Sequence, residues 1–412
     1  MDIKLPDQVK SILKILNDNG YASYAVGGCV RDSILGVEPK DWDITTDATP
    51  DQIESLFAQT IPTGKKYGTI TGVWDSEACL SEEHYEVTTF RADGNYSDGR
   101  RPDTVTFGKD IIEDLSRRDF TMNAMAYNEL VGLVDPFNGC EHLESGKLVA
   151  VGDAFDRFNE DALRILRAVR FSFKYSLWLS PDIVKGIKKA IDLKLLNNVS
   201  AERIHDEFIK ILTYSNKRSK YIDNDIQILF NELFEVTHMN LKSILDSELP
   251  YTAKIYLLMS DIEYPLYHVE IWLRKYKFSK HDINRIIDLF KLDLFLMPRI
   301  EKDFTFKEFE YTTRLMMNKF SLDSINEYML MENDEFIYKV ELKANLNAPV
   351  HISDLNIDGN IIKELFRKYK YEYTPIDVGV CLNCLMNIVL EDKTKNTSSI
   401  LKNLVKEWIN EK

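Results

Sequence analysis

Residues 24–43 read YAVGGCVRDSILGVEPKDWD, and the order of elements in this stretch decides the fold of the first third of the chain. A short apolar strand leads into Gly27-Gly28, and a helical pattern follows. Two glycines let the backbone turn tightly and bring bare N–H groups against an anion, while the helix start adds partial positive charge. Arg31, in the first turn, can donate to a phosphate oxygen. The stretch predicts an anion-binding turn, although a Gly-Gly pair alone is more often a plain strand-to-helix turn.

Two carboxylates close the same stretch, in the triplet Asp41-Trp42-Asp43. In a strand, residues i and i+2 share a face, so Asp41 and Asp43 project together while Trp42 points toward the core. Two like charges held this close are costly unless a cation lies between them. Mg²⁺ takes such hard oxygen ligands together with substrate phosphates and water. The alternative is a solvated strand face, on which an Asp-x-Asp pattern is common.

A third carboxylate is available on another predicted strand. In the run Tyr85–Phe90 the alternation places Glu86 and Thr88 on one face. Glu86 can complete a three-carboxylate site with Asp41 and Asp43 that holds two metal ions about 3.5–4 Å apart. One metal ion then lowers the pKa of an attacking hydroxyl, and the other holds a triphosphate and the leaving pyrophosphate. We therefore predict that these three residues are catalytic and bind Mg²⁺, the expected cofactor.

The surrounding sequence indicates an α+β fold. Short β-rich runs, broken by turn residues, end near residue 107, and helical patterns interleave at Leu5–Asn19, Pro50–Phe57 and Asp119–Asn128. After residue 155 helical periodicity dominates. We expect a mixed α/β head followed by an elongated all-α neck, body and tail, with the boundaries 1–150, 151–220, 221–350 and 351–412.

The formal net charge of −14 argues, taken alone, against a nucleic-acid partner, because phosphate binding depends on positive charge. The charge is unevenly distributed, however. Residues 1–150 carry 14 basic and 26 acidic side chains, whereas residues 151–220 carry 14 basic and 9 acidic ones. The one net-positive segment therefore follows directly on the acidic head, where an RNA end would have to enter.

Three basic clusters lie in or next to this net-positive segment. Each cluster is by itself more often a solvated helix face than a binding site, but together they predict an RNA-binding surface. The clusters are Arg164, Arg167 and Arg170; Lys185, Lys188 and Lys189; and Lys217, Arg218 and Lys220.

Composition excludes several other classes of protein. A hydrophobic fraction of 44% excludes disorder as the general state. The five cysteines show no disulfide-like spacing, and Cys381-x-x-Cys384 has no second pair, so we expect a reducing compartment and no zinc site. No run approaches the ~20 apolar residues of a membrane helix. We expect a cytoplasmic protein without a membrane partner, and nothing in the sequence indicates a protein partner.

The glycine pair, the Asp-x-Asp triplet and the later strand glutamate, in this order, resemble the polymerase-β-type nucleotidyltransferases. Further motifs resemble those of the class II tRNA nucleotidyltransferases, the CCA-adding enzymes, and of the related bacterial poly(A) polymerases. These motifs are SRRDFTMNAMAYN at 116–128, DPFNG at 135–139, RFNEDALRILRAVRF at 157–171 and SAERIHDEF at 200–208. Weaker similarity continues to the C-terminus, so the resemblance spans nearly the whole chain.

The resemblance implies roles for a second set of residues. It implies that Gly27, Gly28 and Arg31 hold phosphates. It also implies that Asp119 contacts the ribose, whereas Arg118 and Asn123 contact the triphosphate and the nucleotide. The residue types suit these roles, because an aspartate at a helix start accepts a hydrogen bond from a sugar hydroxyl while it caps the helix. The alternative is an ordinary N-cap beside a solvated arginine pair.

The motif EDALR at 160–164 is implied to select the incoming base. On one helix, Asp161 and Arg164 are i, i+3 neighbours, and Glu160 lies i, i+4 from the arginine, so the three head groups converge. Cytosine and adenine each present an exocyclic amine beside a ring-nitrogen acceptor, which an Asp/Arg pair can read. Uracil and guanine place a carbonyl opposite the aspartate and leave it unpaired. A plain intrahelical ion pair is the alternative. With Arg167 and Arg170, these two residues complete the predicted nucleotide-binding set.

The resemblance implies a template-independent enzyme that adds or repairs the 3′-terminal CCA of tRNA from CTP and ATP. The neck selects the base, the tail binds tRNA, and the polar loop RADGNYSDGRR at 91–101 accompanies addition of the final A. The alternatives are an A-adding-only enzyme, a poly(A) polymerase and a catalytically inactive RNA-binding relative. A small-molecule nucleotidyltransferase fits the long helical half poorly.

Overall fold

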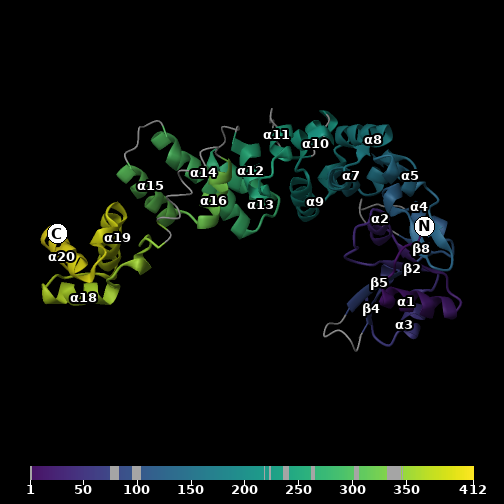
Figure 1. Ribbon diagram of the computed structural model, residues 1–412, viewed down its shortest axis with the longest axis horizontal. Helices are drawn as coiled ribbons and strands as arrows, with labels where there is room; N and C mark the ends of the chain where they lie inside the picture. The colour runs from purple at the N-terminus through teal and green to yellow at the C-terminus, as the bar shows by residue number, and fades with distance from the viewer. Residues whose placement is uncertain are drawn as a thin grey trace. The chain divides into compact units, whose positions relative to one another are not determined.

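The chain was examined as a computed structural model, which describes residues 2–74, 83–94, 104–217, 219–221, 224–234, 241–260, 265–300, 306–331, 345 and 347–412. It separates into two compact units, Met1–Glu248 and Leu249–Lys412 (Figure 1). The first unit contains all of the described strands together with eleven of the helices. The mixed head and the all-α remainder confirm the α+β prediction, and the four-part division within them stays a prediction.

A mixed seven-stranded sheet forms the head, with the strand order β3-β4-β5-β2-β1-β8-β9. Neighbouring strands are antiparallel except for β2 and β5, which pair in parallel. The strands are β1 (Ser23–Val26), β2 (Ile44–Thr46), β3 (Thr60–Gly64), β4 (Thr69–Trp74), β5 (Glu83–Thr89), β8 (Ala126–Asn128) and β9 (Gly132–Val134). The parallel pair places the start of β2 beside the middle of β5, with Ile44 opposite Val87.

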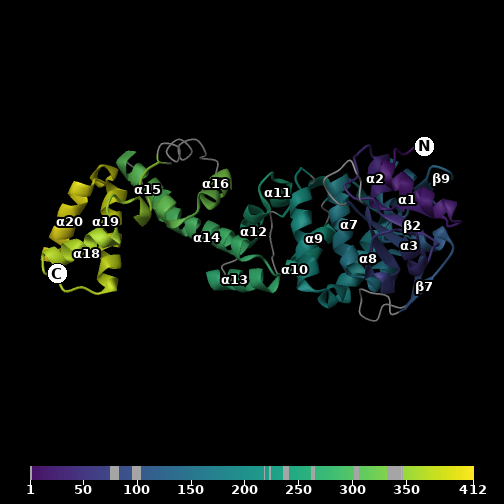
Figure 2. The same cartoon turned by 90° about the horizontal axis from the view of Figure 1, so that it is seen from below.

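Two shorter pairs of strands complete the β-structure. They are β6 (Arg91–Asp93) with β7 (Val105–Phe107), and β10 (Lys147–Leu148) with β11 (Trp178–Leu179). Helices α1 (Asp7–Asp18) and α3 (Pro50–Leu56) pack against the sheet, α1 on β1 and α3 on β4 and β5 (Figure 2).

The predicted helix at Asp119–Asn128 is wrong. The segment forms a short 3₁₀ turn, η2 (Thr121–Asn123), and then strand β8, which pairs with β1 and β9. All residues from 119 to 128 are buried. A short apolar run that is buried on all sides has no amphipathic period, so periodicity cannot distinguish a strand from a helix there.

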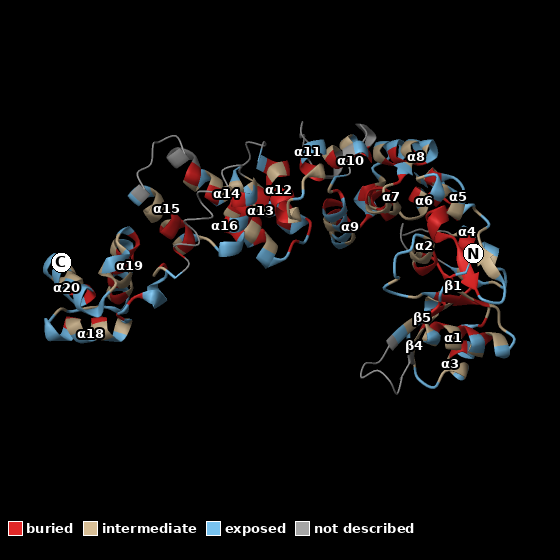
Figure 3. Cartoon of the chain, in the orientation of Figure 1, coloured by how far each residue is buried: buried red, intermediate tan, exposed pale blue. Residues whose placement is uncertain are grey.

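Helices cover the rest of the first unit. Figure 3 shows that one of these helices, α7, carries many buried residues. Including α2, they are α2 (Gly28–Ile34), α4 (Ile111–Ser116), α5 (Gly139–Glu144), α6 (Ala154–Glu160), α7 (Leu163–Tyr175), α8 (Pro181–Asp192), α9 (Ala201–Tyr214), α10 (Asn224–Phe234) and α11 (Leu241–Asp246). Contacts of α7 with α6 and α9 make a helical layer that continues from the head.

The described part of the second unit is helical, with one core that runs through it. Buried residues of this core include Leu289, Tyr328, Phe366 and Cys381. Its helices are α12 (Tyr251–Ser260), α13 (Leu266–Lys275), α14 (Lys280–Ile300), α15 (Phe306–Lys319), α16 (Leu322–Met331), α18 (Gly359–Lys368), α19 (Pro375–Glu391) and α20 (Ser398–Asn410). Over the residues that the structure describes, no helix combines the length and apolar character needed to cross a membrane.

Candidate nucleotide-binding site

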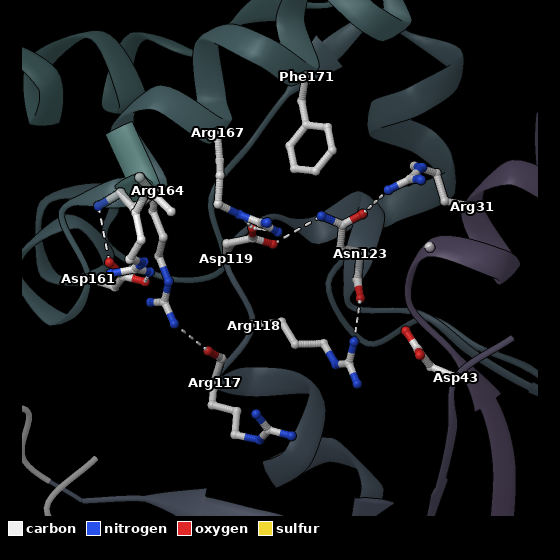
Figure 4. A pocket seen from close by; sticks show the side chains of 13 residues that line it. Arg31, Asp43, Arg117, Arg118, Asp119, Asn123, Asp161, Arg164, Arg167 and Phe171 are labelled. Atoms are coloured by element: carbon white, nitrogen blue, oxygen red, sulfur yellow. Dashed lines mark hydrogen bonds and ion pairs between the residues drawn. The ribbon is translucent and has the colours of Figure 1, made fainter. Parts of the chain in front are cut away.

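A charged cavity of about 440 Å³ lies in the first unit, between the head sheet and the helices that follow it. Its lining contains six arginines and three aspartates (Figure 4). The lining residues are Gly28, Arg31, Asp43, Arg117, Arg118, Asp119, Asn123, Asp161, Leu163, Arg164, Arg167, Phe171 and Arg203. Segments that are far apart in the sequence therefore supply one basic cavity, although the head as a whole is acidic.

The glycine turn forms one wall of the cavity. Gly27 has φ 80°, a conformation that favours glycine, and a Cβ built on it would lie 2.7 Å from Nη1 of Arg118. The amide of Gly27 donates to the carbonyl of Met125 at 3.0 Å, which ties the turn to β8. The predicted strand, glycine turn and helix are thus present, and the backbone conformation of Gly27 favours glycine, whereas a side chain there would also displace the end of Arg118.

Arg31, on α2, is buried and held from three directions. Its guanidinium pairs with Asp32 at 2.8 Å and donates to Oδ1 of Asn123. It also packs over the ring of Tyr175, 4.5 Å from the centroid, in a cation–π contact. These contacts fix the direction of the guanidinium before any ligand binds.

Asp119 lies at the centre of the polar network. Its Oδ2 accepts from Nε and Nη2 of Arg167 at 2.8 and 2.6 Å, and its Oδ1 accepts from Asn123 and from the amide of Phe120. Burial by itself raises the pKa of Asp119, but Arg167, the Asn123 hydrogen bond and Arg164 outweigh burial and lower the pKa to about 2. Asp119 is therefore an anion at any pH at which the protein works. It does not cap a helix, contrary to the prediction.

The motif at 160–164 does not form one helix, which corrects the predicted geometry. Helix α6 ends at Glu160 and α7 begins at Leu163, because Asp161 is extended, with φ −146° and ψ 103°. The side chain of Asp161 accepts from the amide of Leu163, the first residue of α7, at 3.1 Å. An aspartate that bonds locally to the backbone competes with helix continuation, and this explains the break.

Because of this break, the two predicted base-reading residues, Asp161 and Arg164, form ion pairs with different residues. Arg164 pairs with Glu160 at 2.5 Å, as predicted, and also donates to the carbonyls of Arg157 and Arg117 at 3.2 Å. Asp161 instead pairs with Arg203 of α9 at 2.7 Å. Both residues line the cavity, but each is held by its own partner and not by the other.

Arg170 does not line the cavity. A step of three residues falls about 60° short of a full helical turn, so the third arginine of the series points well away from the first. It pairs with the buried Glu207 of α9 at 2.6 Å and lies 4.2 Å from the ring centroid of Phe171. Its geometry supports a role in packing α7 against α9, and not the predicted contact with a nucleotide.

The three predicted metal ligands, Asp41, Asp43 and Glu86, are called the carboxylate edge below. The backbone at the first two is not the strand that was predicted. Strand β2 begins at Ile44, so Asp41 and Asp43 directly precede the strand, and Trp42 is only half-buried. Lost hydration raises the pKa of Asp43, Arg118 lowers it, and Asp41 raises it again. Lost hydration, followed by the charges of Asp43 and Asp41, raises the pKa of Glu86. The three carboxylates are therefore close enough to repel one another.

Across the described residues, no three His, Cys, Asp or Glu side chains lie close enough together to hold a metal ion. Asp43 lines the cavity, and the charges of Asp41 and Asp43 act on Glu86, but the three carboxylates do not close into a cage. Their oxygen donors and their mutual repulsion nevertheless suit a hard divalent cation. The three-carboxylate metal site stays a prediction.

Other predicted surfaces have mixed outcomes. Lys185, Lys188 and Lys189 are exposed on α8, where Lys189 lies over the ring of Phe155. Of the polar loop at 91–101, the start forms β6, and residues 95–101 lie outside the described residues. The third basic cluster is described at Lys217 and Lys220 but not at position 218.

Three charged or aromatic lining residues were not predicted: Arg117, Phe171 and Arg203. The first directly precedes the predicted Arg118, and the second closes the motif at 157–171. Arg203 stands in the motif SAERIHDEF, which carried the resemblance but no predicted role. Arg203 could have been found only from that motif. Its contact with Asp161 spans 42 positions of sequence, so no local pattern indicates it.

Comparisons with known proteins agree with this geometry. Residues 23–149 match the family model of the poly(A) polymerase head domain, and residues 177–221 match the probable RNA- and SrmB-binding site of polymerase A. CCA-adding enzymes of Staphylococcus aureus, strains Newman and bovine RF122, are 38% identical over 328 and 326 residues, which is 77% of either chain.

Solved structures are similar over nearly the whole chain. The CCA-adding enzyme of Bacillus stearothermophilus in complex with CTP is 25% identical, with a TM-score of 0.75 and 99% of both chains covered. The Thermotoga maritima CCA-adding enzyme complexed with tRNA is 19% identical, with a TM-score of 0.70, and covers 99% of this chain and 100% of its own. At that identity the second likeness supports the fold alone.

Proposed function

The chain belongs to the CCA-adding enzymes, a family of tRNA nucleotidyltransferases, and we propose that it adds or repairs the 3′-terminal CCA of tRNA from CTP and ATP with release of pyrophosphate. The observation that supports this most strongly is the cavity, in which six arginines and three aspartates meet beside the carboxylate edge. The CTP complex of the Bacillus relative and the 38% identity to CCA-adding enzymes of Staphylococcus aureus support the choice of substrates.

The arginines of the cavity are proposed to hold the triphosphate. Arg31 and Arg118 lie on the head side of the cavity, next to the glycine turn and Asp43. A guanidinium group can donate two parallel hydrogen bonds to a phosphate, and it stays charged at any working pH. A triphosphate held there directs its α-phosphate toward the carboxylate edge, where the 3′-hydroxyl of the RNA attacks in line.

Asp119 is proposed to hold the ribose. Each of its oxygens already accepts two hydrogen bonds, so a ribose hydroxyl binds by replacing one donor. Arg167 is the donor that leaves most readily, because a third of its side chain is exposed. The ribose hydroxyl then keeps Asp119 paired while Arg167 turns toward the phosphates or the RNA.

Asp161 and Arg164 are proposed to select the base. The Asp161 carboxylate accepts from the exocyclic amine of cytosine or adenine, and the Arg164 guanidinium donates to the ring nitrogen. With uracil or guanine the carboxylate faces a carbonyl and stays unpaired, which is strongly unfavourable in a buried site. Because both residues are anchored by other partners, the pair acts as a fixed template.

Asp41, Asp43 and Glu86 are proposed to hold divalent metal, with Mg²⁺ as the natural ion. When bound, the metal supplies a lowered pKa for the attacking hydroxyl and charge neutralisation for the leaving pyrophosphate. The residues of the chain contribute the oxygen donors, and Arg118 opposes the rise in the pKa of Asp43 that lost hydration causes.

The test is incorporation into a tRNA that ends before CCA, with CTP alone, ATP alone and both together. We expect two C residues from CTP alone and a complete CCA only when both are present, with UTP and GTP excluded. Addition of a single A, and only to a tRNA that already ends in CC, would identify an A-adding enzyme. A long A tail would identify a poly(A) polymerase, and absence of any incorporation would contradict the proposal.

A further inference from the structure

Asp114 is a buried carboxylate next to the cavity that is not among the lining residues. It lies in α4 with no exposed surface. A carboxylate without water is costly unless it is paired and hydrogen-bonded, so its partners indicate its purpose. Those partners come from three parts of the head: the end of α4, strand β2 and strand β6.

Both partners in the region after α4 are arginines of the cavity. Oδ1 of Asp114 accepts from Nε and Nη2 of Arg117 at 3.0 and 2.7 Å, a two-point contact that fixes the plane of the guanidinium. Oδ2 of Asp114 lies 3.6 Å from Nη2 of Arg118. One carboxylate thus stands between two neighbouring guanidinium groups.

The charge of Asp114 allows these two arginines to lie side by side. Two guanidinium groups at this spacing repel each other, and the repulsion is poorly screened beside a partly buried cavity. With Asp114 between them the three groups together carry one positive charge. Arg118 then lies between two carboxylates, those of Asp114 and Asp43. Figure 4 shows the second of them beside Arg118.

The same carboxylate is tied to the strand that leads from the carboxylate edge. The single hydroxyl hydrogen of Thr45, in β2, faces both Oδ2 of Asp114 at 3.3 Å and the carbonyl of Thr88 at 3.1 Å. Oδ1 of Asp114 also accepts from the amide of Arg91, at the start of β6, at 3.4 Å. Asp43 lies two residues before Thr45, so these contacts relate the position of the arginines to that of the metal-binding edge.

We propose that Asp114 is a positioning residue: it holds the guanidinium groups of Arg117 and Arg118 at the spacing that a nucleoside triphosphate requires, and sets that pair against the strand that follows Asp43. The inference rests on the proposed function, because it concerns how the same cavity binds the triphosphate. Asp114 itself touches no substrate. Since the triphosphate is common to CTP and ATP, the effect of Asp114 is the same for both nucleotides.

The test is Asp114→Asn in the full-length protein, which preserves the shape of the side chain and removes its charge. We expect the KM for CTP and the KM for ATP to rise by the same factor, roughly tenfold or more, since hydrogen bonds to charged groups are the strong ones. The discrimination against UTP is expected to stay unchanged. When Asp114→Asn is combined with Arg117→Gln, we expect the effects on KM to be less than multiplicative, because both substitutions break the same contact.

Glu327→Gln is the matched control. Glu327 is also a buried carboxylate, pairs with Arg285 and accepts from the hydroxyl of Thr252, but it lies in the second unit. We expect it to lower the melting temperature without changing either KM. Wild-type KM values in Asp114→Asn, or equal changes of KM in both variants, would overturn the inference.

A second variant keeps the inference testable if Asp114→Asn does not fold. Thr45→Val removes only the hydroxyl that faces Asp114 and preserves the buried volume, and we expect a twofold to fivefold rise of both KM values. An unchanged KM in Thr45→Val would then overturn the inference. The wild-type protein is assayed beside each variant, so failure of the proposed function shows as an inactive wild type, whereas failure of this inference shows as an active wild type and a variant with the same KM values.

Discussion

The two sides of the nucleotide cavity differ in how their charges are balanced. On the arginine side every guanidinium has an acidic partner, and two of them share one: Arg31 has Asp32, Arg117 and Arg118 share Asp114, Arg164 has Glu160, Arg167 has Asp119, and Arg203 has Asp161. On the other side burial and the charge of Asp41 raise the pKa of Asp43, against the effect of Arg118, and burial and the charges of Asp43 and Asp41 raise the pKa of Glu86. The arginine side is preorganised by the protein alone, whereas the carboxylate edge is proposed to need a cation.

The largest expected effect comes from breaking the carboxylate edge. Asp43→Ala removes a proposed metal ligand, and we expect the rate of CTP incorporation to fall roughly a thousandfold or more, since a catalytic metal supplies several kcal/mol. Binding of tRNA, measured by a gel-shift assay, is expected to stay within a few-fold of wild type. Near-normal turnover in this variant would remove Asp43 from the metal site.

Breaking the base-reading pair on the arginine side is expected to change selectivity more than rate. Asp161→Ala removes the acceptor for the exocyclic amine, so we expect the preference for CTP over UTP to fall by about 10- to 100-fold. Nucleotide competition on one tRNA measures this ratio. Glu207→Gln, which disturbs an ion pair on the same helical layer outside the cavity, serves as the control. A preference that survives Asp161→Ala would assign base selection to other residues.

On the arginine side, the contribution of Asp119 to the free energy of unfolding is expected to depend on pH. The pKa of Asp119 is about 2, below its ordinary value, so its contribution is fully present above the unfolded pKa near 4 and is lost as the pH falls toward 2. We expect Asp119→Asn to lower the free energy of unfolding by about 2 kcal/mol at pH 7, and by progressively less below pH 4. Denaturant unfolding across this range measures the difference. A constant difference at every pH would mean that the charge of Asp119 is not responsible.

The smallest expected effect has the opposite sign. Asp43→Asn relieves the repulsion among the three carboxylates, so in metal-free buffer at pH 7 we expect a melting temperature slightly above that of wild type, by less than about 4 °C. Differential scanning calorimetry of the two proteins in chelator measures it. A lower melting temperature in the variant would show that Asp43 is stabilised by its surroundings, like the acids of the arginine side.

Much of the site could be predicted from short-range patterns, because the relevant geometry is local. The turn at Gly27 and the i, i+4 contact of Glu160 with Arg164 depend on neighbours within a few residues. The break at Asp161 and the rotation of Arg170 away from the cavity follow from local geometry as well, but the ion-pair partners of these two residues could not be predicted, because both lie on a distant helix. Those partners, Arg203 and Glu207, stand on α9, about 40 residues further along the chain.

The fold shows the same division. The strand before the glycine turn, β1, and the strand that carries Glu86, β5, were both predicted from their sequence patterns. Strand β8 was not, because its surroundings are buried on all sides and leave no period in the sequence. Asp114 could not be singled out either: an acidic residue in the short sequence IIEDLS is typical of an exposed helix start, and only its partners in β2 and β6 reveal a buried role.

The contrast between a paired arginine side and a carboxylate edge that needs a cation is tested most directly by thermal unfolding in the presence and absence of Mg²⁺. Wild-type protein and Asp43→Asn are each melted in chelator and in millimolar Mg²⁺, without nucleotide or RNA. We expect Mg²⁺ to raise the melting temperature of the wild type, because a ligand that binds only the folded state stabilises it, and to leave Asp43→Asn unchanged. An equal shift in both proteins, or no shift in the wild type, would contradict this division of the cavity.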